Sequence, residues 1–239
     1  MIRVEDLTLH INGKTILEDI DLSIEKGDFL AIIGPNGGGK STLIRCILGF
    51  IKPQKGKIFL FGDEISKFRA WHKIGYLPQR AGKEMNPFNP ITVEEFLLLP
   101  AKWYQKKPKE RHLKNLVELF GLTLHLKKKF FQLSFGQIQR AYLVRALLLE
   151  PEVLFLDEPS VGLDFLSQET FYKILSQLHK EGLTIILITH ETWLISKEVN
   201  KVACLNQRLY FHGDHKDFCI FEKEGMPGFS YHRIEHTHW

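Results

Sequence analysis

The segment GPNGGGKST, at positions 34–42, constrains this chain more than any other stretch of its sequence. It fits the pattern G-x-x-x-x-G-K-[ST], in which glycines let successive backbone N–H groups turn inward and form a concave nest for phosphate oxygens. The apolar run FLAII (29–33) before it predicts a buried parallel strand. The run KSTLIRCILGF after it predicts a helix whose positive N-terminal end favours an anion. The sequence therefore predicts a nucleoside triphosphate bound between a strand and a helix.

Different residue types of this loop are expected to bind different parts of a triphosphate and its metal ion. Lys40 is expected to neutralise the β- and γ-phosphates, and Ser41 offers a hydroxyl ligand for Mg²⁺. The other loop residues expected to contact the nucleotide are Gly34, Pro35, Asn36, Gly37, Gly38, Gly39 and Thr42. A nucleoside triphosphate and Mg²⁺ are the ligands that this arrangement predicts.

A second apolar run, VLFLDEP (153–159), contains two adjacent carboxylates where it ends. An acidic side chain at the C-terminal end of a buried parallel strand can reach the metal of a bound nucleotide, and Asp157 fits that role. Glu158, the next residue, points differently and can polarise an attacking water. Two carboxylates in such a place are costly unless metal, water or hydrogen-bond donors satisfy them. The chain is therefore predicted to hydrolyse a nucleoside triphosphate.

Hydrophobic patterning predicts an α/β fold. Two alternating runs before residue 25 are typical of antiparallel strands, joined at a turn of Asn12 and Gly13. Apolar runs at 29–33, 153–159 and 184–190 are separated by helical patterns, which favours a parallel core.

The region from about 81 to 150 has a different character. It opens with the loop NPFNP and continues with ITVEEFLLLPAKWY and RHLKNLVELFGL, both helix-like, and we interpret it as an inserted helical subdomain. Past residue 211 the pattern weakens into a loop-rich tail with clustered histidines.

Composition limits the class of protein and the cellular compartment that we expect for this chain. With 44% hydrophobic and 25% charged residues and a net charge of +4, the chain is typical of a globular protein, and its charge does not indicate nucleic acid. No apolar run approaches the about 18 residues that span a bilayer. The acidic start MIRVEDLTLH does not fit an export signal, and three cysteines without a CxxC pair favour a reducing cytosol. The basic clusters at 106–114 and 126–130 fit either a solvated helix face or a surface near anionic lipid or a partner.

The order of further motifs is more specific. Gln79 in IGYLPQ is followed by LSFGQ (133–137), VLFLDEP, SVGLD (160–164) and His190 at the end of TIILITH. This series resembles the ATP-binding-cassette ATPases of membrane transporters over about residues 2–215. The resemblance implies a P-loop NTPase (RecA-like) parallel-sheet core with an N-terminal antiparallel β subdomain and an inserted α-helical subdomain. Residues 216–239 would form a histidine-containing tail.

The resemblance also implies roles for single residues. Gln79 resembles the glutamine that contacts the metal and relays the position of the helical subdomain. Asp164 resembles the aspartate that reaches across to the other subunit, and His190 resembles the histidine that contacts the γ-phosphate. An aromatic residue on the first hairpin often stacks on adenine in this family. The matching position here is Ile11, which would cover the ring with less stacking energy and leaves the preference for ATP over GTP less secure.

The segment LSFGQ resembles the family signature, usually Leu-Ser-Gly-Gly-Gln, which clamps the γ-phosphate of ATP bound to the opposite subunit. Ser134 can donate a hydroxyl, Gly136 allows close backbone approach, and Gln137 is retained. Phe135 replaces the first glycine. If that position required positive φ, an aromatic residue there would be strained by about 1–3 kcal/mol. We expect the clamp to function because the other signature residues are present.

The resemblance implies a homodimer that encloses two ATP molecules, separate membrane permease subunits, and indirectly an extracytoplasmic metal-binding protein. It implies no nucleic acid, and it places the chain on the cytoplasmic face of the membrane as a peripheral subunit. Residues 202–218 look like the end of ATPases that serve zinc, manganese or iron uptake. Import of zinc or manganese is the leading expectation, with an iron chelate or another small solute as the alternative.

Two questions stay open at the level of sequence. The histidines at 212, 215, 232, 236 and 238 fit either a divalent-metal sensor or an ordinary surface. The competing classes are a soluble cassette ATPase of DNA repair, chromosome maintenance or translation, and a nonhydrolytic binding module.

Overall fold

The computed structural model describes residues 1–79, 81, 90–160, 164–189 and 199–218, which belong to two compact units. Unit 1 comprises residues 1–69 and the chain from residue 184 onward, and unit 2 comprises residues 70–183. The predicted phosphate loop therefore lies in unit 1, and the paired carboxylates lie in unit 2. None of the helices in the described part of the chain combines the length and apolar character needed to cross a bilayer.

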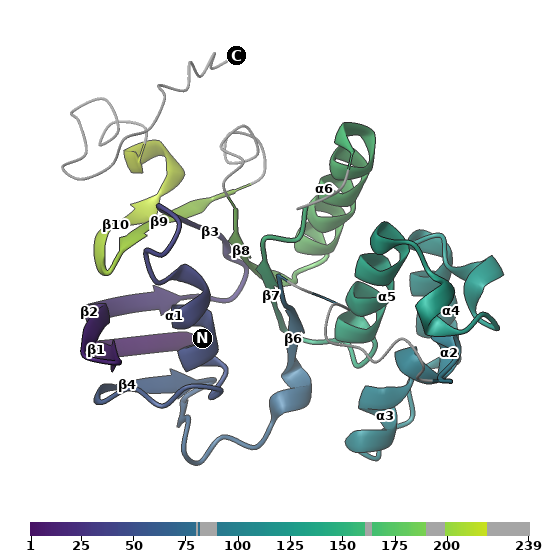
Figure 1. Ribbon diagram of the computed structural model, residues 1–239, viewed down its shortest axis with the longest axis horizontal. Helices are drawn as coiled ribbons and strands as arrows, with labels where there is room; N and C mark the ends of the chain where they lie inside the picture. The colour runs from purple at the N-terminus through teal and green to yellow at the C-terminus, as the bar shows by residue number, and fades with distance from the viewer. Residues whose placement is uncertain (80, 82–89, 161–163, 190–198, 219–239) are drawn as a thin grey trace. The chain divides into compact units, whose positions relative to one another are not determined.

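Unit 1 begins with an antiparallel sheet of strand order β2-β1-β4-β5 (Figure 1). Its strands are β1 (Ile2–Ile11), β2 (Lys14–Ile24), β4 (Lys55–Leu60) and β5 (Asp63–Glu64). The predicted hairpin is confirmed: Asn12 and Gly13 both have positive φ, as a two-residue turn between twisted strands requires. Alternate side chains of β1 and β2 are buried, so one face of this sheet packs against the core.

The second part of unit 1 is the parallel arrangement that carries the phosphate loop. Strand β3 (Phe29–Ile33) pairs in parallel with β8 (Thr184–Ile188) on one side and with β9 (Lys201–Asn206) on the other. Strand β10 (Arg208–Asp214) closes this edge in an antiparallel pair with β9. Every residue of β3 and β8 is buried, which explains why both strands read as uninterrupted apolar runs. Helix α1 (Lys40–Ile47) follows the loop.

Unit 2 combines a parallel strand pair with helices. Strand β6 (Ile74–Leu77) pairs with β7 (Val153–Asp157), and a short 3-10 turn, η1 (Trp71–Lys73), precedes β6. The helices are α2 (Val93–Leu97), α3 (Leu99–Trp103), α4 (Glu110–Leu119), α5 (Phe135–Leu147) and α6 (Phe165–Lys180). Two further 3-10 turns are η2 (Thr123–His125) and η3 (Phe130–Gln132).

The predicted helical stretches are helical, with one difference. ITVEEFLLLPAKWY forms two short helices rather than one, because Pro100 occupies the start of α3 and Leu98 ends α2. The bounds of about 81–150 for a separate helical subdomain remain a prediction.

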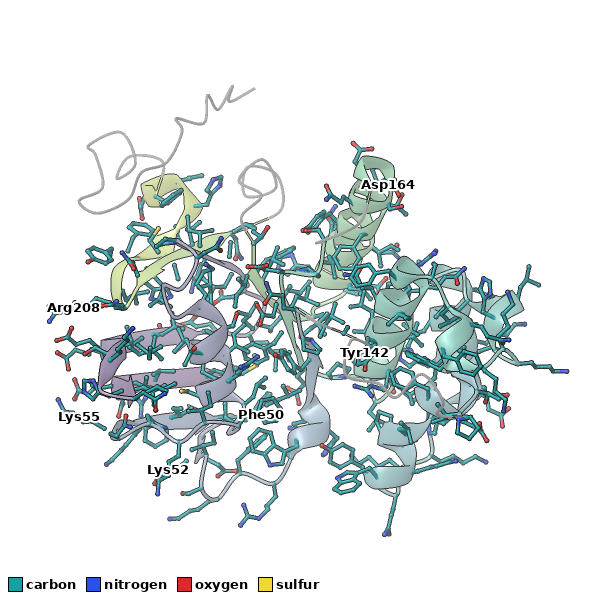
Figure 2. The ribbon with its side chains drawn as sticks, viewed as in Figure 1. Phe50, Lys52, Lys55, Tyr142, Asp164 and Arg208 are labelled. Carbon is teal, nitrogen blue, oxygen red and sulfur yellow. The ribbon has the colours of Figure 1, made fainter. Side chains whose placement is uncertain are left out.

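Aromatic packing holds the helices of unit 2 together. Phe96 of α2 lies with its ring centroid 4.2 Å from that of Phe130 and 4.9 Å from that of Tyr142 on α5 (Figure 2). The guanidinium of Arg145 lies 4.5 Å from the ring centroids of both Phe96 and Tyr142. Burial lowers the pKa of Arg145, and the two ring faces stabilise its charge. These contacts fix α2 against α5, the helix that begins at the signature.

Replacing Gly75 by alanine is expected to destabilise unit 2. An added Cβ would lie 2.8 Å from the carbonyl oxygen of Ala146 on α5 and 2.9 Å from the side chain of Leu154. Overpacking of this kind typically costs about 1–3 kcal/mol. Thermal unfolding measures the effect, with Gly213→Ala as the matched control because its Cβ would meet only the Phe211 ring. Equal unfolding midpoints for the two variants would contradict the packing of α5 on β6.

Candidate active site

The phosphate loop of unit 1 holds its lysine inside the loop. The ammonium of Lys40 is buried and donates hydrogen bonds to the carbonyl oxygens of Gly34 and Pro35, each at 2.9 Å. These carbonyls keep the charge beside the loop's backbone N–H groups instead of letting it extend into solvent. A phosphate that enters the loop therefore meets a cation already in place.

Close backbone packing explains two of the loop's glycines. A Cβ on Gly34 would lie 1.9 Å from the carbonyl oxygen of Leu205, where β9 passes the loop. Gly39, with φ of 96°, would bring a Cβ within 2.8 Å of the carbonyl oxygen of Ile16 on β2. The loop can therefore approach these two strands only with glycine at both positions.

The turn between β9 and β10 braces the loop from outside. The backbone N–H of Gln207 donates to the carbonyl oxygen of Gly38 at 2.9 Å, and the N–H of Glu18 donates to the carbonyl oxygen of Gln207 at 2.8 Å. Arg208 forms a two-pronged ion pair with Glu18, at 2.6 and 3.0 Å, between β10 and β2 (Figure 2). Sequence reasoning missed this brace, because its backbone contacts join segments about 170 residues apart or more and leave no local pattern.

Unit 2 brings Gln79 and Glu158, two residues with predicted roles in catalysis, into contact. Asp157 is buried at the end of β7, while Glu158 has a left-handed backbone with φ of 49°. Glu158 directly follows the last residue of this strand. The amide Nε2 of Gln79 donates a hydrogen bond to the carboxylate Oε2 of Glu158.

The signature forms the N-cap and first turn of α5. Ser134 is the N-cap: its Oγ accepts a hydrogen bond from the backbone N–H of Gln137 at 3.4 Å, and Gln137 Oε1 accepts one from the backbone N–H of Ser134 at 2.9 Å. Because Oγ acts as an acceptor in this capping box, its hydroxyl hydrogen stays available for an outside anion. Ser134 is exposed to solvent.

The structure answers the question raised by Phe135. Phe135 is the first residue of α5 and has a helical backbone, and it is not among the non-glycine residues with positive φ. The expected source of strain is therefore absent at this residue. Gly136 follows in the first turn of the same helix.

The structure describes the surroundings of all but one of the remaining predicted site residues. Asp164 caps α6 by accepting hydrogen bonds from the Ser167 backbone N–H at 3.0 Å and from the Ser167 hydroxyl at 2.7 Å (Figure 2). Ile11 is 41% exposed at the tip of the first hairpin, and Ser41 and Thr42 are half-buried in the first turn of α1. His190 lies outside the described residues.

Comparisons with known proteins agree with these motifs. The ABC transporter family matches residues 17–161. The chain belongs to this family. It is 36% identical over 227 residues to the zinc uptake system ATP-binding protein ZurA of Listeria innocua, covering 91% of this chain and 87% of the relative. It is 35% identical over 216 residues to the manganese transport system ATP-binding protein MntB of the same organism, covering 88% of each chain.

A solved structure confirms the fold of the cassette. The structure of cbiO1 from Clostridium perfringens, part of the ABC transporter complex cbiONQ, has a TM-score of 0.78 and 29% sequence identity. The match covers 93% of this chain and 92% of the other. The α/β fold with a parallel core, an antiparallel sheet and helices is thus the family fold, and the cassette is an ATP-binding ATPase of the ABC class.

The histidines of the C-terminal region remain without a metal assignment. His212 on β10 is half-buried, and burial together with the charge of Lys201 lowers its pKa. Among the residues that the structure describes, no group of three or more His, Cys, Asp or Glu side chains could hold a metal ion. The histidines at 232, 236 and 238 lie outside the described residues.

Replacing Lys40 by alanine is expected to weaken ATP binding by the cassette about tenfold or more, because a charge-assisted hydrogen bond typically contributes about 1.5–3 kcal/mol. Titration with a labelled ATP analogue measures the affinity. Lys26→Ala, which removes an exposed lysine of the same unit, is the control. Equal affinity in the two variants would exclude the assigned role of Lys40.

Replacing Phe135 by glycine is expected to bring no gain in ATP turnover. The phenylalanine already has helical backbone, and glycine lowers helix stability by about 1 kcal/mol relative to alanine. Turnover by the assembled transporter is the measurement, and Phe135→Ala separates loss of the ring from loss of helix stability. A clear rise in turnover for Phe135→Gly alone would show that the ring impairs the signature.

Proposed function

We propose that this cassette hydrolyses Mg·ATP to drive import of a divalent metal ion, zinc or manganese, through separate permease subunits at the cytoplasmic face of the membrane. The observation that carries the catalytic part is the hydrogen bond from Gln79 to Glu158. It joins the proposed general base to the residue proposed to contact the metal. The names of the two Listeria relatives, one for zinc uptake and one for manganese transport, support the metal substrate.

The proposed ligands of Mg²⁺ fit its chemistry. Ser41 offers a hydroxyl, Asp157 a carboxylate and Gln79 an amide oxygen, and Mg²⁺ prefers hard oxygen donors. Because Nε2 of Gln79 is engaged by Glu158, the amide oxygen Oε1 is the atom left to serve as a ligand. The bound metal would neutralise charge on the phosphates.

Different side chains of this protein are proposed to bind the phosphates and to activate the attacking water. Lys40 binds the phosphates in unit 1, and Glu158 accepts the proton of an attacking water in unit 2. Its hydrogen bond to Gln79 holds the carboxylate in a defined direction before nucleotide arrives. Any movement of Gln79 therefore changes the surroundings of the base.

We propose that two copies pair head-to-tail around two ATP molecules. The exposed hydroxyl of Ser134 and the N-terminal end of α5 form an anion-binding surface in unit 2. Each copy would present this surface to the ATP held by the phosphate loop of the other copy. ATP then stabilises the paired state only, and hydrolysis removes that stabilisation.

A cavity of about 620 Å³ in unit 2 is proposed as the docking site for a cytoplasmic helix of the permease. It is lined by residues of β6, α3 and α5, including Tyr76, Leu99, Trp103 and Arg145. Trp103 is 83% exposed, an unusual state for the largest apolar side chain. Large aromatic side chains of this kind often dominate the binding energy of protein interfaces.

Replacing Trp103 by alanine is expected to weaken association with the permease about tenfold or more, as loss of an interface anchor usually does. Copurification of the membrane subunits with a tagged cassette measures it. Tyr210→Ala, at an aromatic residue 42% exposed in unit 1, is the matched control. If the two variants retain the permease equally, the cavity is not the docking site.

Replacing Glu158 by glutamine is expected to preserve ATP binding and reduce turnover about a hundredfold or more, because general-base catalysis contributes about 10²–10⁴-fold. Metal uptake by the reconstituted transporter, followed with radioactive zinc and manganese, should fall with it. Wild-type turnover in this variant refutes the assigned base. Normal turnover by the wild-type transporter with neither ion moved refutes the metal substrate.

A further inference from the structure

The side chain of His125 contacts the signature. His125 is the last residue of η2, nine positions before Ser134, and its ring nitrogen Nε2 lies 3.3 Å from the amide nitrogen Nε2 of Gln137. The family roles stated above do not include this residue. The contact is part-buried, so water competes with it less than at an open surface.

Hydrogen-bond directions around Gln137 fix the state of the histidine ring. The amide oxygen Oε1 of Gln137 accepts the backbone N–H of Ser134 at 2.9 Å, so the amide cannot turn over without placing two donors face to face. The amide nitrogen must then point to His125 and donate. Nε2 of His125 is therefore the acceptor, and the ring is neutral with its hydrogen on Nδ1.

The other ring nitrogen of His125, Nδ1, has an unfavourable environment in this tautomer. Nδ1 of His125 is buried and has no hydrogen-bond partner among the described residues. A buried donor without a partner is unfavourable. The contact that the ring makes through Nε2 is thus the polar interaction that accounts for a histidine at this position.

The backbone around His125 is tied to the start of α2. The N–H of His125 donates to the carbonyl oxygen of Leu122, and its carbonyl accepts the N–H of Lys128, both at 2.9 Å. The N–H of Glu94 donates to the carbonyl oxygen of Leu126 at 3.0 Å. The imidazole is therefore held by a turn that is hydrogen-bonded at both ends and to α2.

We infer that His125 is a positioning residue for the signature. By accepting from Gln137, it orients the amide whose oxygen caps Ser134, and so fixes the N-terminal end of α5 where the γ-phosphate of a second copy's ATP would bind. This inference rests on the proposed function of the signature. It adds to that function a residue outside LSFGQ on which the geometry of the clamp depends.

Three substitutions separate positioning from simple packing. His125→Phe keeps a ring and removes the acceptor. His125→Asn places its polar atoms near the position of Nδ1, too short to reach Gln137. His125→Gln carries an amide oxygen about as far from the backbone as Nε2, and so restores the acceptor.

The assembled transporter supplies the decisive kinetics. His125→Phe and His125→Asn are expected to lower kcat for ATP about tenfold, the effect of one lost hydrogen bond in the transition state, and His125→Gln is expected to stay within about twofold of wild type. ATP affinity of the separate full-length chain, measured with a labelled analogue, and its melting temperature should stay unchanged in all three. A purely structural role predicts a lower melting temperature and no rescue by glutamine.

A fourth variant distinguishes failure of this inference from failure of the proposed function. If Ser134→Ala leaves turnover unchanged, the signature does not act on ATP. The proposed function of the signature and the inference about His125 are then both wrong. If Ser134→Ala abolishes turnover while His125→Phe matches wild type, the proposed function stands and the inference about His125 is wrong. The inference is equally wrong if His125→Gln is as slow as His125→Phe.

Discussion

Phosphate binding at the N-terminal ends of two helices is the interaction on which the proposed function depends. Gly39, the N-cap of helix α1, provides no side-chain hydrogen bond, and the N-terminal end of this helix favours the phosphate proposed to bind there. Helix α5 begins at Ser134, which is capped by Gln137 and still keeps a hydroxyl hydrogen to donate. The first start lies in unit 1 and the second in unit 2. In the proposed dimer, each triphosphate would bind at α1 of one copy and at α5 of the other.

Unit 2 carries both the proposed base and the cavity proposed for the permease. The hydrogen bond between Gln79 and Glu158 connects the proposed base to the segment that follows β6. Residues of β6 also line the cavity proposed for the permease. The aromatic cluster around Phe96 joins α2 to α5, and Arg145 belongs to both this cluster and the cavity wall. A partner seated in the cavity would thus touch β6, which leads to Gln79, and α5, which begins with the signature.

Sequence reasoning predicted what local physics determines. The loop at 34–42, the carboxylates ending β7 and the hairpin turn at Asn12 all follow from residue type and spacing. It could not predict the β9–β10 brace, the Gln79–Glu158 bond or the contact of His125, because each joins residues that are distant in sequence or depends on side-chain direction. The strain considered at Phe135 came from the family's glycine at that position, and it disappears once the backbone is known to be helical.

Subunit mixing tests the central claim, that each ATP is held by the phosphate loop of one copy and the signature of the other. A transporter is assembled from one Lys40→Ala copy and one Ser134→Ala copy, each purified through its own tag, and its ATP turnover is measured. If the loop and signature act between copies, one complete site remains and turnover is about half that of the wild type. If they act within one copy, both sites are broken, and turnover no higher than that of the Lys40→Ala/Ser134→Ala double variant would contradict the account.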